Sequence, residues 1–303
     1  MKLASLLLAA CSVMPLASVS AQNPPAEVAK KIEAALPDRA FAPPEKPRKL
    51  LLFSATNGFH HESIPTGLFA LAELGKKSGA YEAVVSNDIS NFEVDQLKRF
   101  DAICFLSTTQ DVFMPHPNLR KSMTPEQLKD AEARAERLKK NFLAYLRSGH
   151  GFVGIHAATD TCQEWPEYGE MIGGCFDGHP WDAKAKVGIK VESGKEKHPL
   201  VAMFKGENLV LKEEIYQFKA PYDSRNVDML LRLDTDKTPM DVKGIKRKDK
   251  DFGVSWAKHY GKGRVFYCSL GHNHDIYWQP VVLTHYLAGI QWALGDFKVD
   301  VQP

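Results

Sequence analysis

The chain has 303 residues, of which 44% are hydrophobic and 25% charged, and this is the composition of a globular protein rather than a disordered or fibrous one. Its 39 Lys and Arg residues nearly balance 37 Asp and Glu residues, which gives a formal net charge of +2. This balance leaves no electrostatic footprint for a nucleic acid or an anionic membrane as partner.

The first 21 residues are typical of a signal peptide. Lys2 precedes an apolar run over residues 3–10, and Val19-Ser20-Ala21 offers small residues at the spacing that a signal peptidase reads. The run is shorter than the roughly 20 apolar residues that cross a bilayer. We therefore expect cleavage after Ala21 and a periplasmic or secreted protein that is not integral to the membrane.

A second interpretation of this segment is a lipoprotein signal. Leu8-Ala9-Ala10 precedes Cys11 as in a bacterial lipoprotein cleavage site, and cleavage there would leave Cys11 acylated at the new N-terminus. Because Cys11 lies unusually close to Met1, we favour the signal peptide over residues 1–21.

Residues 22–48 form a Pro-rich leader. Six prolines in this stretch prevent continuous helix or sheet, except over residues 26–35. We expect the leader to wrap the surface of one domain that spans residues 49–297.

From residue 49 onward, apolar runs of strand length alternate with segments of helical spacing. Thr124 and Gln127 resemble a capping box at the start of the longest helix. Strands are predicted at 49–54, 81–85, 101–106 and 152–155, and helices at 64–78, 91–99 and 124–147. Such alternation predicts an α/β fold with a parallel sheet.

The second half of the domain lacks long helices between its strands, so we expect mixed or antiparallel pairing there. A final helix is predicted at 281–294, and Gly261 with Gly263 predicts a hairpin turn. The basic run at 243–250 is expected to be a solvated hairpin tip. The strands are predicted at 187–191, 209–211, 229–233, 254–257 and 265–269.

Four cysteines remain after removal of the signal peptide. Cys104 and Cys268 lie in apolar strand-like runs and are expected to be core thiols. Cys162 and Cys175 flank one loop-helix segment, which makes them the better candidates for a disulfide in an exported protein.

Three histidine-containing segments follow predicted strands. His60 and His61 come after the first strand, His156 comes directly after the fourth, and His272 follows the last. Ligands of open, mostly parallel sheets bind at the carboxyl ends of the strands. We therefore expect these imidazoles to meet in one polar pocket.

Several motifs along the sequence resemble those of a known family. The ordered motifs are similar to those of the ThuA-like, or trehalose-utilisation, family over about residues 49–296; they are Phe53–Ile64, Gly151–Thr161, Ile172–Pro180, Glu213–Tyr216 and Gly261–Tyr267 with Leu270-Gly271-His272. The resemblance implies a flavodoxin-like fold similar to class I glutamine amidotransferases, with helices on both faces of the sheet.

The same resemblance suggests what the site does not do. Amidotransferases place a nucleophilic Cys on the turn after a strand. His156 occupies that position here, and Cys162 follows six residues later, so we do not expect glutaminase chemistry.

The candidate site residues fall into three groups. His156 and His272 are the expected acid/base pair. Glu214 is preferred to Glu213, because alternation along a strand would place Glu214 and Tyr216 on one face. The expected ligand-binding residues are Thr56, Phe59, His60, His61, Asp160, Trp165, His179 and Tyr216, with Trp165 and Trp181 as the best stacking walls for a sugar ring. His60, His156 and His272 are also candidate ligands for a divalent metal such as zinc.

Three functional hypotheses follow. The first, implied by the resemblance, is an enzyme of hydrolase, lyase or isomerase type that acts on a carbohydrate or keto-sugar derivative. The second is a non-catalytic carbohydrate-binding protein on the same scaffold. The third is a metal hydrolase with an unrelated substrate. Each expects a small-molecule ligand, and each is compatible with a homo-oligomer.

Overall fold

The computed structural model describes residues 23–301, so the predicted signal peptide and Cys11 lie outside the described residues. Within them, the parallel half of the main sheet is built from strands that meet in register. These strands are β1 (Lys49–Phe53), β2 (Glu82–Val85), β3 (Ala102–Leu106), β4 (Gly151–Ile155) and β11 (Gly263–Cys268). The first four are the strands predicted from the alternating pattern.

The remaining strands of the main sheet pair antiparallel, as the absence of long helices between them predicts. They are β6 (Lys186–Val191), β7 (Leu209–Lys212), β9 (Asp228–Asp234) and β10 (Gly253–Tyr260). In the described chain the main sheet has nine strands in the order β2-β1-β3-β4-β11-β10-β9-β6-β7. The short strands β5 (Cys175–Phe176) and β8 (Phe218–Lys219) form a separate pair.

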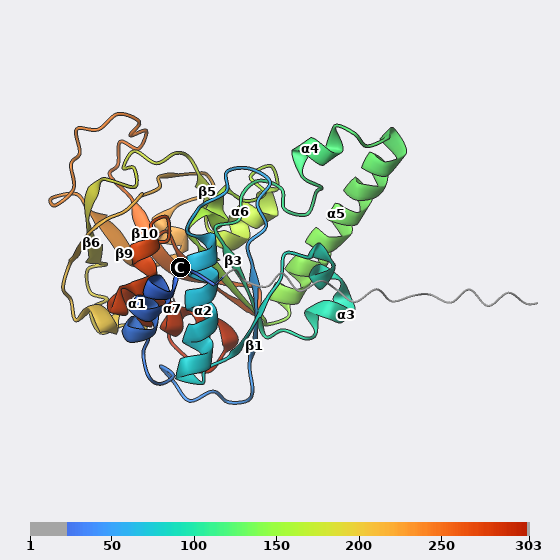
Figure 1. Cartoon of the computed structure of the whole chain (residues 1–303). Coiled ribbons are helices and arrows are strands. Elements are labelled where there is room, and N and C mark those ends of the chain that lie inside the picture. The colour runs from blue at the N-terminus through green and yellow to red at the C-terminus, as the bar shows by residue number, and fades with distance from the viewer. Residues whose placement is uncertain (1–22, 302–303) are drawn as a thin grey trace, which may run out of the picture.

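Helices cover both faces of the sheet (Figure 1). One face carries α1 (Ala26–Ala35), α2 (Ile64–Ser78) and α7 (Pro280–Leu294), and the other carries α3 (Val94–Leu97), α5 (Pro125–Arg147) and α6 (Pro166–Ile172). Alternation along β1 explains the division, because Leu50 and Leu52 pack in the first core while Leu51 and Phe53 pack in the second. The expected α/β fold with helices on both faces is confirmed.

Short helices complete the chain. The predicted helix at 91–99 is instead two pieces, the 3-10 helix η1 (Ile89–Phe92) and α3, and α4 (Pro117–Arg120) precedes α5. The other 3-10 helices are η2 (His156–Asp160), η3 (Ala202–Phe204), η4 (Ser224–Asn226) and η5 (His274–Trp278). The capping box of α5 is present: Thr124 Oγ1 accepts from Gln127 N at 3.2 Å, and Gln127 Oε1 accepts from Thr124 N at 2.9 Å.

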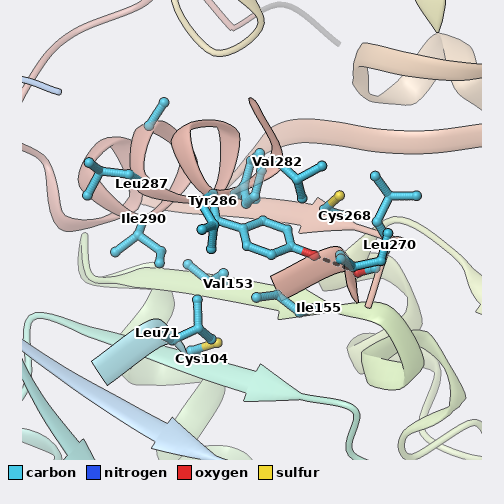
Figure 2. Packing of buried hydrophobic residues seen from close by; sticks show 14 of the residues in the cluster. Leu71, Cys104, Val153, Ile155, Cys268, Leu270, Val282, Tyr286, Leu287 and Ile290 are labelled. Atoms are coloured by element: carbon cyan, nitrogen blue, oxygen red, sulfur yellow. Dashed lines mark hydrogen bonds between the residues drawn. The ribbon is translucent and has the colours of Figure 1, made fainter. Parts of the chain in front are cut away.

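Helix α7 packs against the centre of the sheet, over β4 and β11 (Figure 2). Tyr286 is fully buried there, and its hydroxyl donates to the carbonyl of Leu270 at 2.8 Å. Leu270 directly precedes the Gly271-His272 segment. The core on this face therefore fixes the chain just before one of the predicted site segments.

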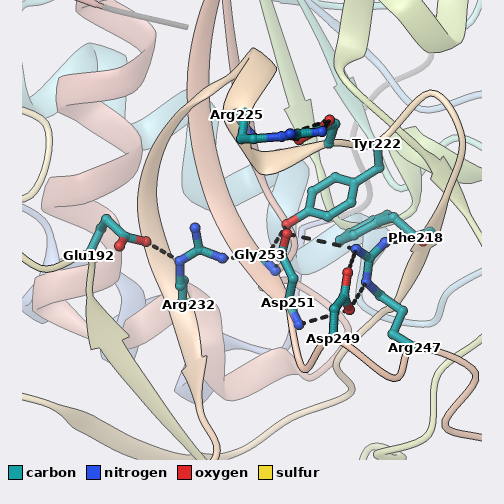
Figure 3. Close-up of polar contacts among 10 residues, drawn as sticks. Glu192, Phe218, Tyr222, Arg225, Arg232, Arg247, Asp249, Asp251 and Gly253 are labelled. Carbon is teal, nitrogen blue, oxygen red and sulfur yellow. Dashed lines mark hydrogen bonds and ion pairs between the residues drawn. The ribbon is translucent and has the colours of Figure 1, made fainter.

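The loop between β9 and β10 is tied to the body rather than free. Arg232 pairs with both Glu192 and Asp251, and the Tyr222 hydroxyl donates to Asp251 at 3.0 Å (Figure 3). Arg247 also donates to the Phe218 carbonyl at 3.0 Å. The basic run at 243–250 lies in this loop between two antiparallel strands and its lysines are exposed, as predicted, but Arg247 packs on the β8 segment.

The predicted disulfide is wrong, since Cys162 and Cys175 are both free thiols. The Cys162 thiol lies 3.6 Å from Asp111 Oδ1, whereas the Cys175 sulfur lies close over Gly169 of α6. The two thiols are directed to different neighbours. Cys104 and Cys268 are buried free thiols, as expected.

The Pro-rich leader lies against the domain. Ile32 of α1 is buried, and the Gln291 side chain of α7 accepts from Phe41 N at 2.7 Å and donates to Ala42 O at 2.7 Å. Over residues 23–301, no helix combines the length and the apolar character that crossing a bilayer requires.

One buried histidine in α7 makes the fold sensitive to acid. His285 lies between the Leu200 carbonyl at 2.7 Å and Ser255 Oγ at 2.9 Å, and burial lowers its pKa to about 4. The unfolded chain, with a histidine pKa of about 6.5, takes up the proton first as the pH falls. The contribution of His285 to stability is therefore present above pH 6.5 and is lost as the pH falls towards 4, by about 3 kcal/mol.

We expect His285→Gln to remove that share of the pH dependence. Urea unfolding measured between pH 7 and pH 4 should show that the free energy of unfolding falls less with pH in this variant than in the wild type. His259→Gln, at an exposed position, is the control and should keep the wild-type slope. An unchanged slope in His285→Gln would contradict the assignment.

Candidate functional site

The site is built at the carboxyl ends of the parallel strands. His156 is the first residue after β4, is fully buried, and has a φ of 52°, which lies in the left-handed region that non-glycine residues rarely adopt. The sharp turn resembles the elbow that presents a nucleophile in related folds. In this protein the turn after β4 presents the imidazole of His156 instead of a thiol.

Three side chains from distant segments converge around His156 and form a cluster of four residues with it. Their possible ligand atoms all lie within 4.8 Å of one another, and the residues are His61, His156, Glu214 and His272. Glu214 Oε1 lies 3.6 Å from His156 Nε2 and 3.1 Å from His272 Nδ1. The ring centroid of His61 lies 4.7 Å from that of His156 and 5.2 Å from that of His272.

The hydrogen bonds of His156 fix its tautomer. Nδ1 lies 2.8 Å from the Ser269 carbonyl oxygen, which can only accept, so Nδ1 carries the proton. Nε2 is therefore an acceptor, 3.1 Å from the Tyr216 hydroxyl. Burial lowers the pKa of His156 well below its ordinary value, which keeps the ring neutral.

One nitrogen of the cluster, His61 Nδ1, is buried without a hydrogen-bond partner in the described residues, whereas His272 Nδ1 lies 3.1 Å from Glu214 Oε1. Burial lowers the pKa of His61 to about 4. Burial also lowers the pKa of His272, but bonding to Glu214 and the charges of Glu214 and Glu213 outweigh it, so the net shift is upward. Unpaired buried nitrogens are costly unless something else binds them.

Glu213 has a different task from its neighbour. Its carboxylate is fully buried and accepts from the backbone N–H groups of Gly271 at 2.7 Å, His272 at 2.6 Å and Asn273 at 3.0 Å. Burial raises the pKa of Glu213 to about 8, against the lowering effect of these three donors. The residue holds the loop after β11 in place and thereby positions the His272 ring.

Gly271 is needed for the same loop. Its φ is +141°, and a Cβ atom there would lie 2.8 Å from the Tyr277 hydroxyl and 3.1 Å from His156 Cβ. Ser63 Oγ also donates to the Gly271 carbonyl at 2.9 Å. The loops after β1, β4 and β11 are therefore packed directly on one another.

The rim of the cluster reaches solvent. His179 is half exposed, and its Nδ1 lies 3.3 Å from Glu214 Oε2. The Phe59 side chain is 63% exposed and meets the His61 ring edge-on at 4.8 Å. The His272 side chain is 21% exposed. The cluster therefore has solvent-exposed neighbours beside His61 and beside Glu214.

Some predicted site residues lie outside the cluster. His60 is exposed, and its Nδ1 lies 3.1 Å from Thr56 Oγ1. His61 therefore occupies the position in the cluster that was predicted for His60. Asp160 and Trp165 line a separate cavity of about 450 Å³ beyond η2. Trp181 is not a stacking wall, because it is 1% exposed and its Nε1 donates to the Pro239 carbonyl at 2.7 Å.

Sequence reasoning missed two features of this site. The choice between His60 and His61 carries no sequence signal, because the residues are adjacent and identical. The role of Glu213 was visible only as one of two acidic residues before Ile215 and Tyr216. The structure places Glu214, the residue preferred for the pocket, in the cluster, although the strand nearby, β8, begins only at Phe218.

The cluster has the chemistry of a transition-metal site. Imidazole nitrogens and a carboxylate are the usual ligands of zinc and related divalent ions. Histidine ligands commonly donate their second ring N–H to a backbone carbonyl, as His156 does to Ser269. The residues present therefore fit a divalent ion.

The anchoring by Glu213 can be tested by stability. We expect Glu213→Ala to lower the free energy of unfolding by at least about 3 kcal/mol, because three buried N–H groups lose their acceptor. Chemical denaturation of Glu213→Ala and of the exposed control Glu207→Ala measures the difference. Equal stability of the two variants would refute the anchoring role.

The sequence and the fold are similar to those of known proteins. The family model described as trehalose utilisation, ThuA, matches residues 49–293. A thua-like protein from Bacteroides uniformis has a similar structure, with a TM-score of 0.59 and 20% identity over 82% of this chain and 92% of that chain. A thua-like protein from Parabacteroides merdae gives a TM-score of 0.53 and 19% identity over 82% and 90%.

Identities this low show a shared fold and nothing about the reaction. No curated protein matches the chain. The family model nevertheless covers most of the sequence, including every strand of the main sheet and all four members of the cluster. The chain therefore belongs to the ThuA family and has the fold of the class I glutamine amidotransferase-like superfamily.

Proposed function

We propose that this protein is a divalent-metal-dependent enzyme that acts on a carbohydrate or keto-sugar derivative. The observation that carries the proposal is the convergence of His61, His156, His272 and Glu214 within 4.8 Å. The family description, trehalose utilisation, supports the substrate class. The signal-like sequence at residues 1–21 supports export as part of the same proposal.

A bound metal explains the cluster better than proton transfer by the same residues. A general acid or base has to contact the substrate, but His156 is 0% exposed and lies beneath its neighbours. The unpartnered Nδ1 of His61 points to a ligand-holding role as well. This revises the expected pairing of His156 and His272 as acid and base.

A divalent ion held by these four residues would polarise a carbonyl or hydroxyl oxygen of the substrate as a Lewis acid. Proton transfer then falls to a residue at the rim. His179 is the best placed, because it is half exposed and its Nδ1 is 3.3 Å from Glu214. Glu214 orients the His179 ring, while the Ser269 carbonyl orients His156 through Nδ1 at 2.8 Å and leaves Nε2 for the ion.

The metal assignment predicts a sharp difference between two adjacent histidines. We expect the purified chain to bind one equivalent of zinc, and His61→Ala to weaken zinc binding at least about 100-fold, because loss of a ligand costs no less than loss of a supporting residue. His60→Ala is the matched control and should keep wild-type affinity. Mass spectrometry of bound metal with competitive chelator titration measures both. No bound metal in the wild type, or equal losses in the two variants, would overturn the proposal.

A second prediction concerns turnover. Glucosides and their 3-keto forms, incubated with the zinc-loaded protein and followed by mass spectrometry, should give product that disappears with chelator. We expect His179→Gln to keep its zinc and to lower kcat by about 10²- to 10⁴-fold, since it loses a proton-transfer group. His259→Gln serves as the control. Binding of these sugars without product would favour the non-catalytic carbohydrate-binding protein instead.

A further inference from the structure

A second cavity lies next to the cluster and is not used by the proposed chemistry. It has a volume of about 450 Å³, within the range of small-molecule pockets, and is lined by Gln110, Arg120, Lys139, Asp160, Gln163 and Trp165. Its floor is the paired ends of the segments after β3 and β4. There Gln110 N donates to the Asp160 carbonyl, and Cys162 N donates to the Gln110 carbonyl, each at 3.0 Å.

The backbone of this floor is held in an unusual conformation. Gln110 has a φ of 57° and Cys162 a φ of 49°, although neither is a glycine. Such residues are found where the surrounding structure over-determines them, often beside ligand sites. These two residues therefore mark a floor that the surrounding structure holds in place.

The walls combine an aromatic ring with neutral and charged polar groups. Trp165 is partly exposed at the start of α6, and Lys139 Nζ lies 5.5 Å from the centroid of its ring. The amide of Gln163 donates to Asp160 Oδ1 at 2.5 Å. The Nε atom of Arg120 is buried and has no hydrogen-bond partner among the described residues. An acceptor on a ligand would satisfy it.

The charges of the cavity indicate a neutral ligand. Lys139 is paired with Asp111 at 2.8 Å, and the lining also holds Arg120, Asp160 and Glu164. A phosphate or a sugar acid would therefore meet three carboxylates and only two cations. An uncharged polyol, whose hydroxyl groups both donate and accept hydrogen bonds, fits this lining better, with the Trp165 ring as the apolar part of the wall.

One short helix separates the cavity from the cluster. Helix η2 begins at His156 and ends at Asp160, and its five residues rise about 8 Å at roughly 2 Å per residue. On the other side, the Gln110 side chain lies against Gly58, next to the Phe59–His61 segment. Two segments of the chain therefore connect the cavity lining to the cluster.

We propose that this cavity is a second sugar subsite, which binds the ring adjoining the one that meets the metal. Substrates of at least two rings are then preferred to single rings. The inference rests on the proposed function, because it needs a sugar at the cluster. It adds Trp165, Asp160 and Arg120 as specificity-determining residues that lie away from the reacting atoms.

The test compares a disaccharide probe with a single-ring probe on the full zinc-loaded chain. Isothermal titration calorimetry with α,α-trehalose and methyl α-D-glucoside should show at least tenfold tighter binding of the disaccharide. Trp165→Ala should abolish that preference without changing affinity for the single ring or the zinc content. Asp160→Asn is a milder second variant and should reduce the preference in the same direction.

The control is Trp278→Ala, which removes another partly exposed Trp that has a lysine, Lys31, at 5.5 Å from its ring centroid. This variant should keep the disaccharide preference. If zinc and both probes bind but the wild type shows no preference, or Trp165→Ala keeps it, the subsite is refuted while the proposed function stands. If the wild type binds no zinc or neither probe, the proposed function itself fails and the subsite falls with it.

Discussion

The carboxylate of Glu213 is the interaction on which the arrangement of the site depends. It accepts three backbone N–H groups from Gly271, His272 and Asn273, which lie about 58 residues away in the chain. Such donors satisfy the acceptor oxygens of a carboxyl group that is buried away from water. This contact joins the segment after β7 to the loop after β11. The next residue, Glu214, then points the other way and enters the cluster.

The strand order makes this meeting possible. β11 is the last strand in the sequence but lies beside β4, to which it is parallel. The chain reaches that position through the antiparallel hairpin of β10 and β11. As a result His156 and His272, which follow β4 and β11, emerge at the same sheet edge. The carbonyl of Ser269, just beyond β11, accepts from His156 and completes the connection.

Packing beneath this edge leaves the cluster little freedom. Tyr286 holds the Leu270 carbonyl, Tyr277 and Ser63 hold the Gly271 carbonyl, and Tyr267 donates to the His156 carbonyl at 2.8 Å. Side chains held by such supporting hydrogen bonds are preorganised for binding. By contrast, His179, Phe59 and His60 at the rim are largely exposed. The cluster is therefore held in place by hydrogen bonds, whereas the rim residues reach solvent.

The sequence by itself determined the elements and the edge at which the chemistry lies. The apolar run Leu50–Phe53 and the helical spacing over 64–78 predict buried faces. This periodicity is a local property, so it can be recognised in one segment without knowledge of the others. The rule for parallel sheets then brings His156 and His272 together without knowledge of distances. Only the tertiary structure decided between His60 and His61, gave Glu213 its anchoring role, buried Trp181 and kept Cys162 apart from Cys175. Each of these depends on which distant segment a side chain meets, and that partner is not encoded in the neighbouring residues.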